Sequence, residues 1–166
     1  MSTSGNRTGW VAPTAGERLR ILQRTRTVAL VGASANRARP SYFVATYLLS
    51  SSTDYTVWLV NPKETEILGQ PVYPSLSALP EAPDLVDVFR KPEDLELVAT
   101  QTVELGAKVL WLQLGLTSPA AARVASQAGL DVVMDRCLKI EHARFAGGLH
   151  LAGFDTGVIS SRRRLR

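Results

Sequence analysis

The residues best suited to bind an anion lie between positions 31 and 41, directly after the first apolar run of the chain. Gly32 predicts a tight turn, and the small side chains at positions 33 and 34 let a phosphate approach the backbone. Arg39 adds a charge-assisted contact, and the following helix presents the positive end of its dipole. The pattern predicts a phosphate-binding loop; the alternative is a structural turn with solvated arginines. The residues expected in this loop site are Gly32, Ala33, Ser34, Arg39, Pro40 and Ser41.

The fingerprint of dinucleotide-binding proteins is incomplete around this loop. Ser34 and Arg37 replace its second and third glycines, and no acidic residue ends the second apolar run to hold a ribose hydroxyl. The segment Asn61-Pro62-Lys63 stands there instead. Lys63 suits an additional phosphate better than a ribose diol, so the pattern disfavours NAD and leaves an NADP-like anion open. The alternative for Asn61 and Pro62 is a turn that merely ends a strand.

Two further apolar runs also end in residues that could contact a nucleotide. Phe89 either stacks on a base or belongs to the core, and Arg90 either contacts phosphate or pairs with a nearby acidic side chain. After the fourth run, Gln113, Leu114 and Gly115 offer one amide side chain and backbone donors. Gly115 indicates a turn or a close approach of the backbone, which is a weak signal by itself.

Catalytic groups are harder to find in the sequence. Cys137 and His142 are five residues apart, which does not place them on one face of a helix, and no third group can be assigned to orient them. Asp135, Arg136 and Glu141 are interpreted as a local ionic network. Cys137 is the sole cysteine, so a disulfide framework and a cysteine-based zinc cage are both excluded, and no metal site is expected.

The elements that must position these residues follow a regular rhythm. Five short runs rich in Val, Leu and aromatic residues are nearly continuous in apolarity, as in parallel strands covered on both faces. Helix-like segments separate them, with Pro40, Pro92 and Pro119 near their starts and Gly106 and Gly129 after two of their ends. The strands are expected at residues 27–32, 55–61, 84–90, 107–113 and 130–134.

This alternation predicts an α/β fold, a Rossmann-like three-layer sandwich with a mostly parallel sheet of about five strands. In such sheets, ligands bind at the carboxyl ends of the strands. The domain is expected at residues 14–146, beginning with a lead-in helix. Residues 1–13 are expected to be a flexible N-terminus, and residues 147–166 a C-terminal extension with a basic tail.

Composition narrows the possible partners. The 166 residues carry a net charge of +4, yet residues 27–161 hold ten Lys and Arg against fourteen Asp and Glu, so only the two ends are basic. A folded body that is mildly acidic disfavours nucleic-acid binding. No apolar run reaches the length of a membrane span, and the first residues lack the apolar core of a secretory signal. We therefore expect a cytoplasmic protein that does not enter the membrane.

Six blocks of sequence, in order, resemble the small CoA-binding-domain family of Rossmann-like proteins, which are similar to the nucleotide-binding domain of the succinyl-CoA synthetase alpha subunit. The blocks are VALVGAS with RPSYFVATYLL, VWLVNP, GQPVYPSLSALP, PDLVDVFRKPED, GAKVLWLQLGL and AGLDVVMDRCLKIEHARF. The resemblance runs from about Thr27 to Phe145 and implies coenzyme A as the ligand.

The resemblance also implies a role for each strand end. The loop of residues 32–41 would approach the CoA phosphates, and the second strand end would lie near the adenosine 3′-phosphate and ribose. The end of the fourth strand, on the far side of the site, would face the pantetheine arm. The matching residues of the last three strand ends are Val60, Asn61, Pro62 and Lys63; Phe89 and Arg90; and Gln113, Leu114 and Gly115.

The synthetase domain that carries the phosphorylated histidine has no counterpart among these blocks, so ligase activity is not implied. The chain is interpreted as a non-catalytic module that binds or senses CoA or acyl-CoA, and a homo-oligomer is left open. The alternative is an enzyme that uses CoA thioesters, or another nucleotide such as an NADP-like one, in the same pocket.

Overall fold

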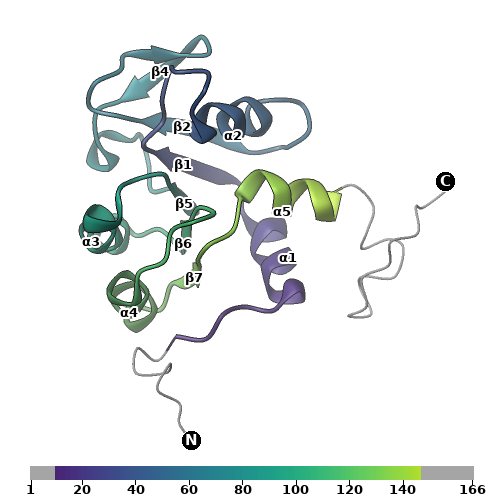
Figure 1. The fold of residues 1–166 in the computed structure, drawn as a ribbon, viewed down its shortest axis with the longest axis vertical. Coiled ribbons are helices and arrows are strands. Elements are labelled where there is room, and N and C mark those ends of the chain that lie inside the picture. The colour runs from purple at the N-terminus through teal and green to yellow at the C-terminus, as the bar shows by residue number, and fades with distance from the viewer. Residues whose placement is uncertain (1–9, 147–166) are drawn as a thin grey trace, which may run out of the picture.

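The computed structural model describes residues 10–146 as a seven-stranded sheet between two layers of helices (Figure 1). The α/β, Rossmann-like fold predicted from the sequence is confirmed. The residues 1–9 and the predicted extension at 147–166 lie outside the described part of the chain. The elements are α1 (Ala15–Arg24), β1 (Thr27–Val31), α2 (Pro40–Leu48), β2 (Thr56–Val60), β3 (Glu66–Ile67), β4 (Gln70–Tyr73), β5 (Leu85–Val88), α3 (Leu95–Leu105), β6 (Val109–Leu112), α4 (Pro119–Gln127), β7 (Asp131–Val133) and α5 (Leu138–Arg144).

The strands lie in the order β3-β4-β2-β1-β5-β6-β7, and all neighbouring pairs are parallel except β3 with β4. Each of the five predicted runs contains one observed strand. The expectation of about five strands was short by two, because β3 and β4 form a small hairpin at the edge of the sheet. Its two strands have only two and four residues, largely exposed, so they lack the apolar run that marks a buried strand.

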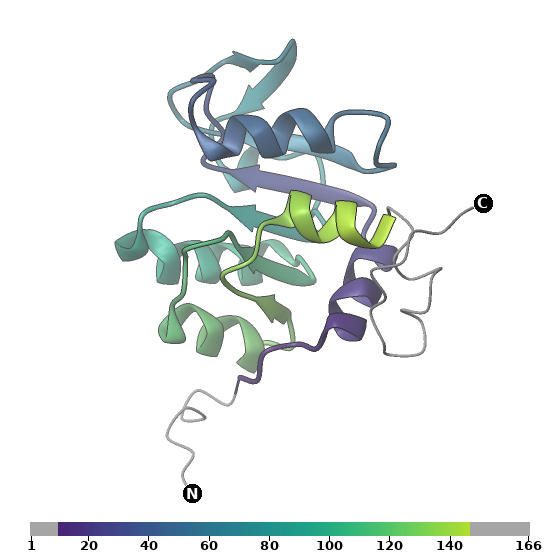
Figure 2. The ribbon, with the colours of Figure 1, turned by 45° about the vertical axis from the view of Figure 1, so that its right-hand side comes forward.

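Two apolar cores lie on the two faces of the sheet (Figure 2). One face packs against α1, α2 and α5, and the fully buried Trp111 belongs to this core. The other face packs against α3 and α4, where the small residues Ala121, Ala122 and Ala125 let α4 approach the sheet closely. Strands buried on both faces explain why the predicted runs are apolar throughout.

The helix boundaries follow the expected signals. Thr14 caps α1 through a reciprocal capping box with Glu17, and Ser118 accepts a hydrogen bond from the amide of Ala121 at the start of α4. Gly106 ends α3 in the left-handed conformation, with φ of 90°. Among residues 10–146, no helix is long and apolar enough to cross a membrane.

The short helix α5 is positioned by a contact with α1, which lies near the other end of the described sequence. Nε of the buried Arg18 in α1 donates a 2.8 Å hydrogen bond to the buried carboxylate of Glu141 in α5. Arg136 also approaches Glu141, at 3.5 Å, whereas Asp135 instead accepts a hydrogen bond from the amide of Gly115. The predicted ionic network is therefore present at Glu141. Arg18 belongs to it, and Asp135 does not.

The chain reverses its direction of travel across the sheet at β1. After β1 it moves to β2 and β4 on one side, and then returns to β5 on the other side. The helices α2 and α3 consequently cover opposite faces, and the segments that follow β1 and β5 diverge at the carboxyl edge. This divergence is the position at which open parallel sheets bind their ligands.

Candidate functional site

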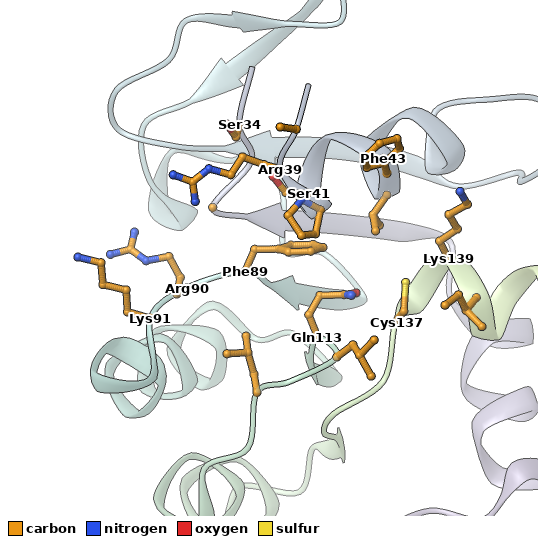
Figure 3. Close-up of a pocket in the computed structure, with 17 residues that line it drawn as sticks. Ser34, Arg39, Ser41, Phe43, Phe89, Arg90, Lys91, Gln113, Cys137 and Lys139 are labelled. Carbon is orange, nitrogen blue, oxygen red and sulfur yellow. The ribbon is translucent and has the colours of Figure 1, made fainter. Parts of the chain in front are cut away.

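A cavity of about 650 Å³ opens at the carboxyl edge of the sheet (Figure 3). Residues that directly follow β1, β5 and β6 form its floor, and the first turn of α2 and the start of α5 form its walls. Its volume is in the range of pockets that hold cofactors and other small ligands. The cavity is therefore the candidate functional site.

The turn after β1 is fixed by a close approach to the segment after β5. Gly32 has a φ of 90°, and a Cβ at this position would overlap the carbonyl oxygen of Phe89. The amide of Phe89 donates a 2.8 Å hydrogen bond to the carbonyl of Val31. Glycine is consequently required at position 32 both for its backbone conformation and for space.

The end of β2 supports the same turn from the other side. The amides of Gly32 and Ala33 both donate to the carbonyl of Val60, at 3.0 and 3.2 Å. Nδ2 of Asn61 donates a 2.6 Å hydrogen bond to the carbonyl of Ala33. Because these two amides are occupied within the protein, the donors that face the cavity must come from further along the loop.

Ser41 is such a donor. Its side chain lines the cavity at the start of α2, and the residue is only 3% exposed. Its hydroxyl is a potential hydrogen-bond donor to a ligand in the cavity. Pro40 at the first position of α2 leaves the positive end of the helix dipole directed at the same space. A phosphate placed here would satisfy the hydroxyl and the helix end together.

Four cationic side chains line the cavity. Arg90 forms a 2.8 Å ion pair with Asp94. This pair agrees with the interpretation that Arg90 pairs with a nearby acidic side chain. Arg39, Lys91 and Lys139 have no ion pair within the described residues. The cavity wall therefore carries more positive charge than the neighbouring carboxylates neutralise, and the site is suited to an anion.

The residues singled out in the sequence fall into two groups. Nine of them line the cavity: Gly32, Ser34, Arg39, Pro40, Ser41, Phe89, Arg90, Gln113 and Leu114. The other six do not: Ala33 and Val60 are buried beneath the turn, and Asn61, Pro62, Lys63 and Gly115 lie outside the lining. Lys63 is exposed at the end of β2.

Phe89 agrees with the interpretation that it belongs to the core, while its stacking on a base stays a prediction. It is partly buried against the core and also lines the cavity at its centre. Gln113 is 4% exposed, and its side-chain oxygen accepts a 3.0 Å hydrogen bond from the amide of Leu138. Gln113 therefore joins the end of β6 to the start of α5, and the residue also lines the cavity.

Several lining residues were not recognised in the sequence. Phe43 and Val44 come from α2, and Cys137, Lys139 and Ile140 come from the start of α5. The helix α5 has only seven residues, so its apolar spacing is too short to be read as a helix. Pro40 marks the start of α2 directly after the predicted phosphate-binding loop. Residues 43 and 44, in the first turns of that helix, could therefore have been predicted to lie near the site. The remaining unrecognised lining residues are Ala38, Lys91 and Leu116.

Among residues 10–146, no histidine lines the cavity beside Cys137. Cys137 lines the cavity, whereas His142 lies on the other side of α5, where its Nδ1 is 2.8 Å from the hydroxyl of Tyr47. His142 also packs edge-on against Tyr55. Partial burial lowers the pKa of His142, and nearby Asp54 opposes that shift. Within the described range, no three His, Cys, Asp or Glu side chains gather as a metal site would require.

Asp87 is an unexpected feature of the central strand β5. Its side chain is fully buried, its neighbours in register are Leu30 and Trp111, and neither carboxyl oxygen has a hydrogen-bond partner among the described residues. Burial raises the pKa of Asp87 well above its ordinary value. The carboxyl group is held in its neutral form more readily than an exposed one, because desolvation penalises the charge.

Comparisons with known proteins identify relatives of this chain. A family model described as a CoA binding domain matches residues 26–143. The uncharacterised protein YneT of Bacillus subtilis is 36% identical over 131 residues, covering 79% of this chain and 96% of YneT. A hypothetical protein from Pyrococcus horikoshii has a solved structure that superposes with a TM-score of 0.76 and 37% identity, covering 89% of this chain and 100% of that one.

One relative has a named activity. The chain is 32% identical over 132 residues to an ADP-forming acetate–CoA ligase of Archaeoglobus fulgidus. The match covers 73% of this chain but only 19% of the ligase. The similarity therefore concerns one part of that enzyme.

Proposed function

The chain belongs to the CoA-binding domain family, and from this membership we propose that it binds coenzyme A in the cavity at the carboxyl edge of its sheet. The observation that carries the proposal is the Ser41 side chain at the start of α2, in a cavity that cationic side chains also line. Coenzyme A is an anion with phosphates at one end, and such a ligand matches this wall.

The diphosphate of CoA is placed between Ser41, Arg39 and the turn at Gly32. Phe89 lies at the centre of the cavity and offers an apolar surface to the ligand between its phosphates and its thiol. Lys63, at the end of β2, is placed near the adenosine 3′-phosphate, which extends beyond the cavity lining. A missing acidic residue at this strand end supports CoA over NAD.

The protein is proposed to bind its ligand without converting it. Cys137 is the thiol that lines the cavity, yet the described histidine is hydrogen-bonded to Tyr47 and does not line it. A nucleophilic thiol is commonly activated by a base within hydrogen-bond reach. The acetate–CoA ligase similarity covers only one-fifth of that enzyme, so it supports binding more directly than catalysis.

A thermal-shift titration tests the proposal. A ligand at one hundred times its dissociation constant adds about 2.7 kcal/mol of stability, which raises Tm by about 5 to 10 °C in a chain of this size. We expect such a rise with CoA, a smaller one with 3′-dephospho-CoA, and almost none with NAD. If NAD raised Tm as much as CoA did, the assignment would be wrong.

A further inference from the structure

The two ends of the cavity differ in chemistry. Arg39, Arg90 and Lys91 gather at one end, and Phe43, Cys137 and Lys139 lie at the other, with Phe89 and Gln113 between them (Figure 3). A ligand that lies along the cavity must therefore be anionic at one end. Its other end meets a largely apolar wall.

Three apolar side chains of the cavity lining are exposed to water. Phe43 is 56% exposed, Ile140 is 55% exposed and Leu114, which follows Gln113, is 62% exposed. These three residues, called here the apolar rim, all line the same cavity. Only three other large apolar side chains of the described chain are comparably exposed, and none of them lines this cavity. An apolar cluster beside a binding cavity is typical of a ligand-binding surface.

We propose that the apolar rim holds the hydrocarbon chain of an acyl group, so that the preferred ligand is a CoA thioester with a medium-length acyl chain. This inference rests on the proposed binding of CoA. With the phosphates at the cationic end, the pantetheine arm runs past Phe89 and Gln113, and the sulfur comes to the end that carries Phe43. An acyl group attached to that sulfur continues onto the rim.

Two features favour a hydrocarbon over a second charged group. Phe43 comes from α2 and Ile140 from α5, two helices that pack together on one face of the sheet, so these two rim residues belong to neighbouring elements. Lys139 is the one cation at this end, and its Nζ lies 5.9 Å from the centre of the Tyr47 ring. Its charge is therefore already engaged with an aromatic face.

Calorimetric titration of the full chain with CoA, acetyl-CoA, octanoyl-CoA and succinyl-CoA tests the inference. Each buried methylene contributes to affinity, and we expect octanoyl-CoA to bind about tenfold more tightly than CoA. Acetyl-CoA, which is too short to reach the rim, is expected to bind within about threefold of CoA. Succinyl-CoA, which ends in a carboxylate, is expected to gain nothing over acetyl-CoA.

Variants of the rim make the measurement specific. Phe43→Ser and Ile140→Ser are each expected to reduce the ratio of octanoyl-CoA to CoA affinity to about threefold or less. Leu97→Ser is the matched control, because Leu97 is 60% exposed on α3, on the opposite face of the sheet. The control should retain the tenfold ratio. Circular dichroism melting curves establish that each variant is folded.

The outcomes separate the two proposals. If CoA binds but octanoyl-CoA binds no more tightly, or if succinyl-CoA is preferred, the acyl-chain inference is overturned and the proposed function stands. The inference is also overturned if a dimer in sedimentation dissociates in Phe43→Ser, because a second copy then covers the rim. If no CoA compound binds, both proposals are wrong. A tenfold preference that Leu97→Ser keeps and Phe43→Ser loses supports both.

Discussion

The Cα of Gly32 lies so close to the carbonyl oxygen of Phe89 that any side chain at position 32 would overlap that oxygen. This contact joins the segments that leave β1 and β5, the two adjacent strands at which the chain reverses its direction across the sheet. The floor of the cavity is therefore built by the backbone itself, and its shape depends on the absence of one side chain.

Gly32→Ala is expected to reduce the free energy of unfolding by at least about 2 kcal/mol, since it combines a positive φ with steric overlap. Urea denaturation measures the change. Gly129→Ala is the matched control: Gly129 has a φ of 89°, but nothing lies within 4 Å of an added Cβ. The control isolates the conformational cost, about 1 kcal/mol. Equal losses in the two variants would show that the contact with Phe89 is unimportant.

Ser41→Ala tests the donor at the start of α2. Removal of a hydroxyl that donates to a phosphate should weaken CoA binding about tenfold, because hydrogen bonds to charged groups are worth about 1.5 kcal/mol or more. The melting temperature without ligand should change little, since the substitution removes a single hydroxyl group from the cavity wall. Ser126→Ala on α4 serves as the control, because that hydroxyl donates to a helix carbonyl. An unchanged affinity in Ser41→Ala would remove the phosphate from this position.

Lys63→Ala tests whether the end of β2 receives the 3′-phosphate. The variant should narrow the difference in affinity between CoA and 3′-dephospho-CoA, because the lost ion pair involves only that phosphate. The matched control is Lys108→Ala, whose exposed side chain precedes β6 at the amino edge of the sheet, opposite the cavity. If both variants preserve the difference measured in the wild type, Lys63 does not contact the 3′-phosphate.

Asp87 predicts an unusual dependence of stability on pH. Burial raises the pKa of its carboxyl well above the ordinary value of 3.8, so the folded state keeps a proton that the unfolded state releases. The free energy of unfolding therefore falls as pH rises from about 4 through the raised pKa. Asp87→Asn cannot ionise, and within that window its stability relative to the wild type should rise by up to about 1.4 kcal/mol per pH unit.

Urea denaturation between pH 4.5 and 8 measures this relative stability. The exposed Glu104 on α3 provides the control variant Glu104→Gln, whose stability should run parallel to that of the wild type. If the free energy of unfolding of Asp87→Asn also ran parallel to that of the wild type, the pKa of Asp87 would not be raised in the folded protein.

The sequence alone determined the local elements. Apolar runs and the residues at their ends act over a few neighbours, so the five principal strands, the proline-led helices and the ends at Gly106 and Ser118 followed from pattern. The same local patterns predicted that Gly32 and Phe89 follow strand ends and that Ser41 begins the helix after the first of them. These strand ends must meet at one edge of a parallel sheet. The hairpin of β3 and β4 escaped notice because it is short and exposed.

Tertiary structure alone decided which residues share the cavity. Cys137, Lys139 and Ile140 reach it because α5 is held across the sheet by Glu141, whose partner Arg18 lies 123 positions away in the chain. Asn61 faces the turn instead of the cavity because its side chain hydrogen-bonds to Ala33. Such contacts join residues that are distant in sequence, and no local periodicity encodes them. The sequence therefore shows which residue types are present at each strand end. Which of them line the cavity depends on long-range packing.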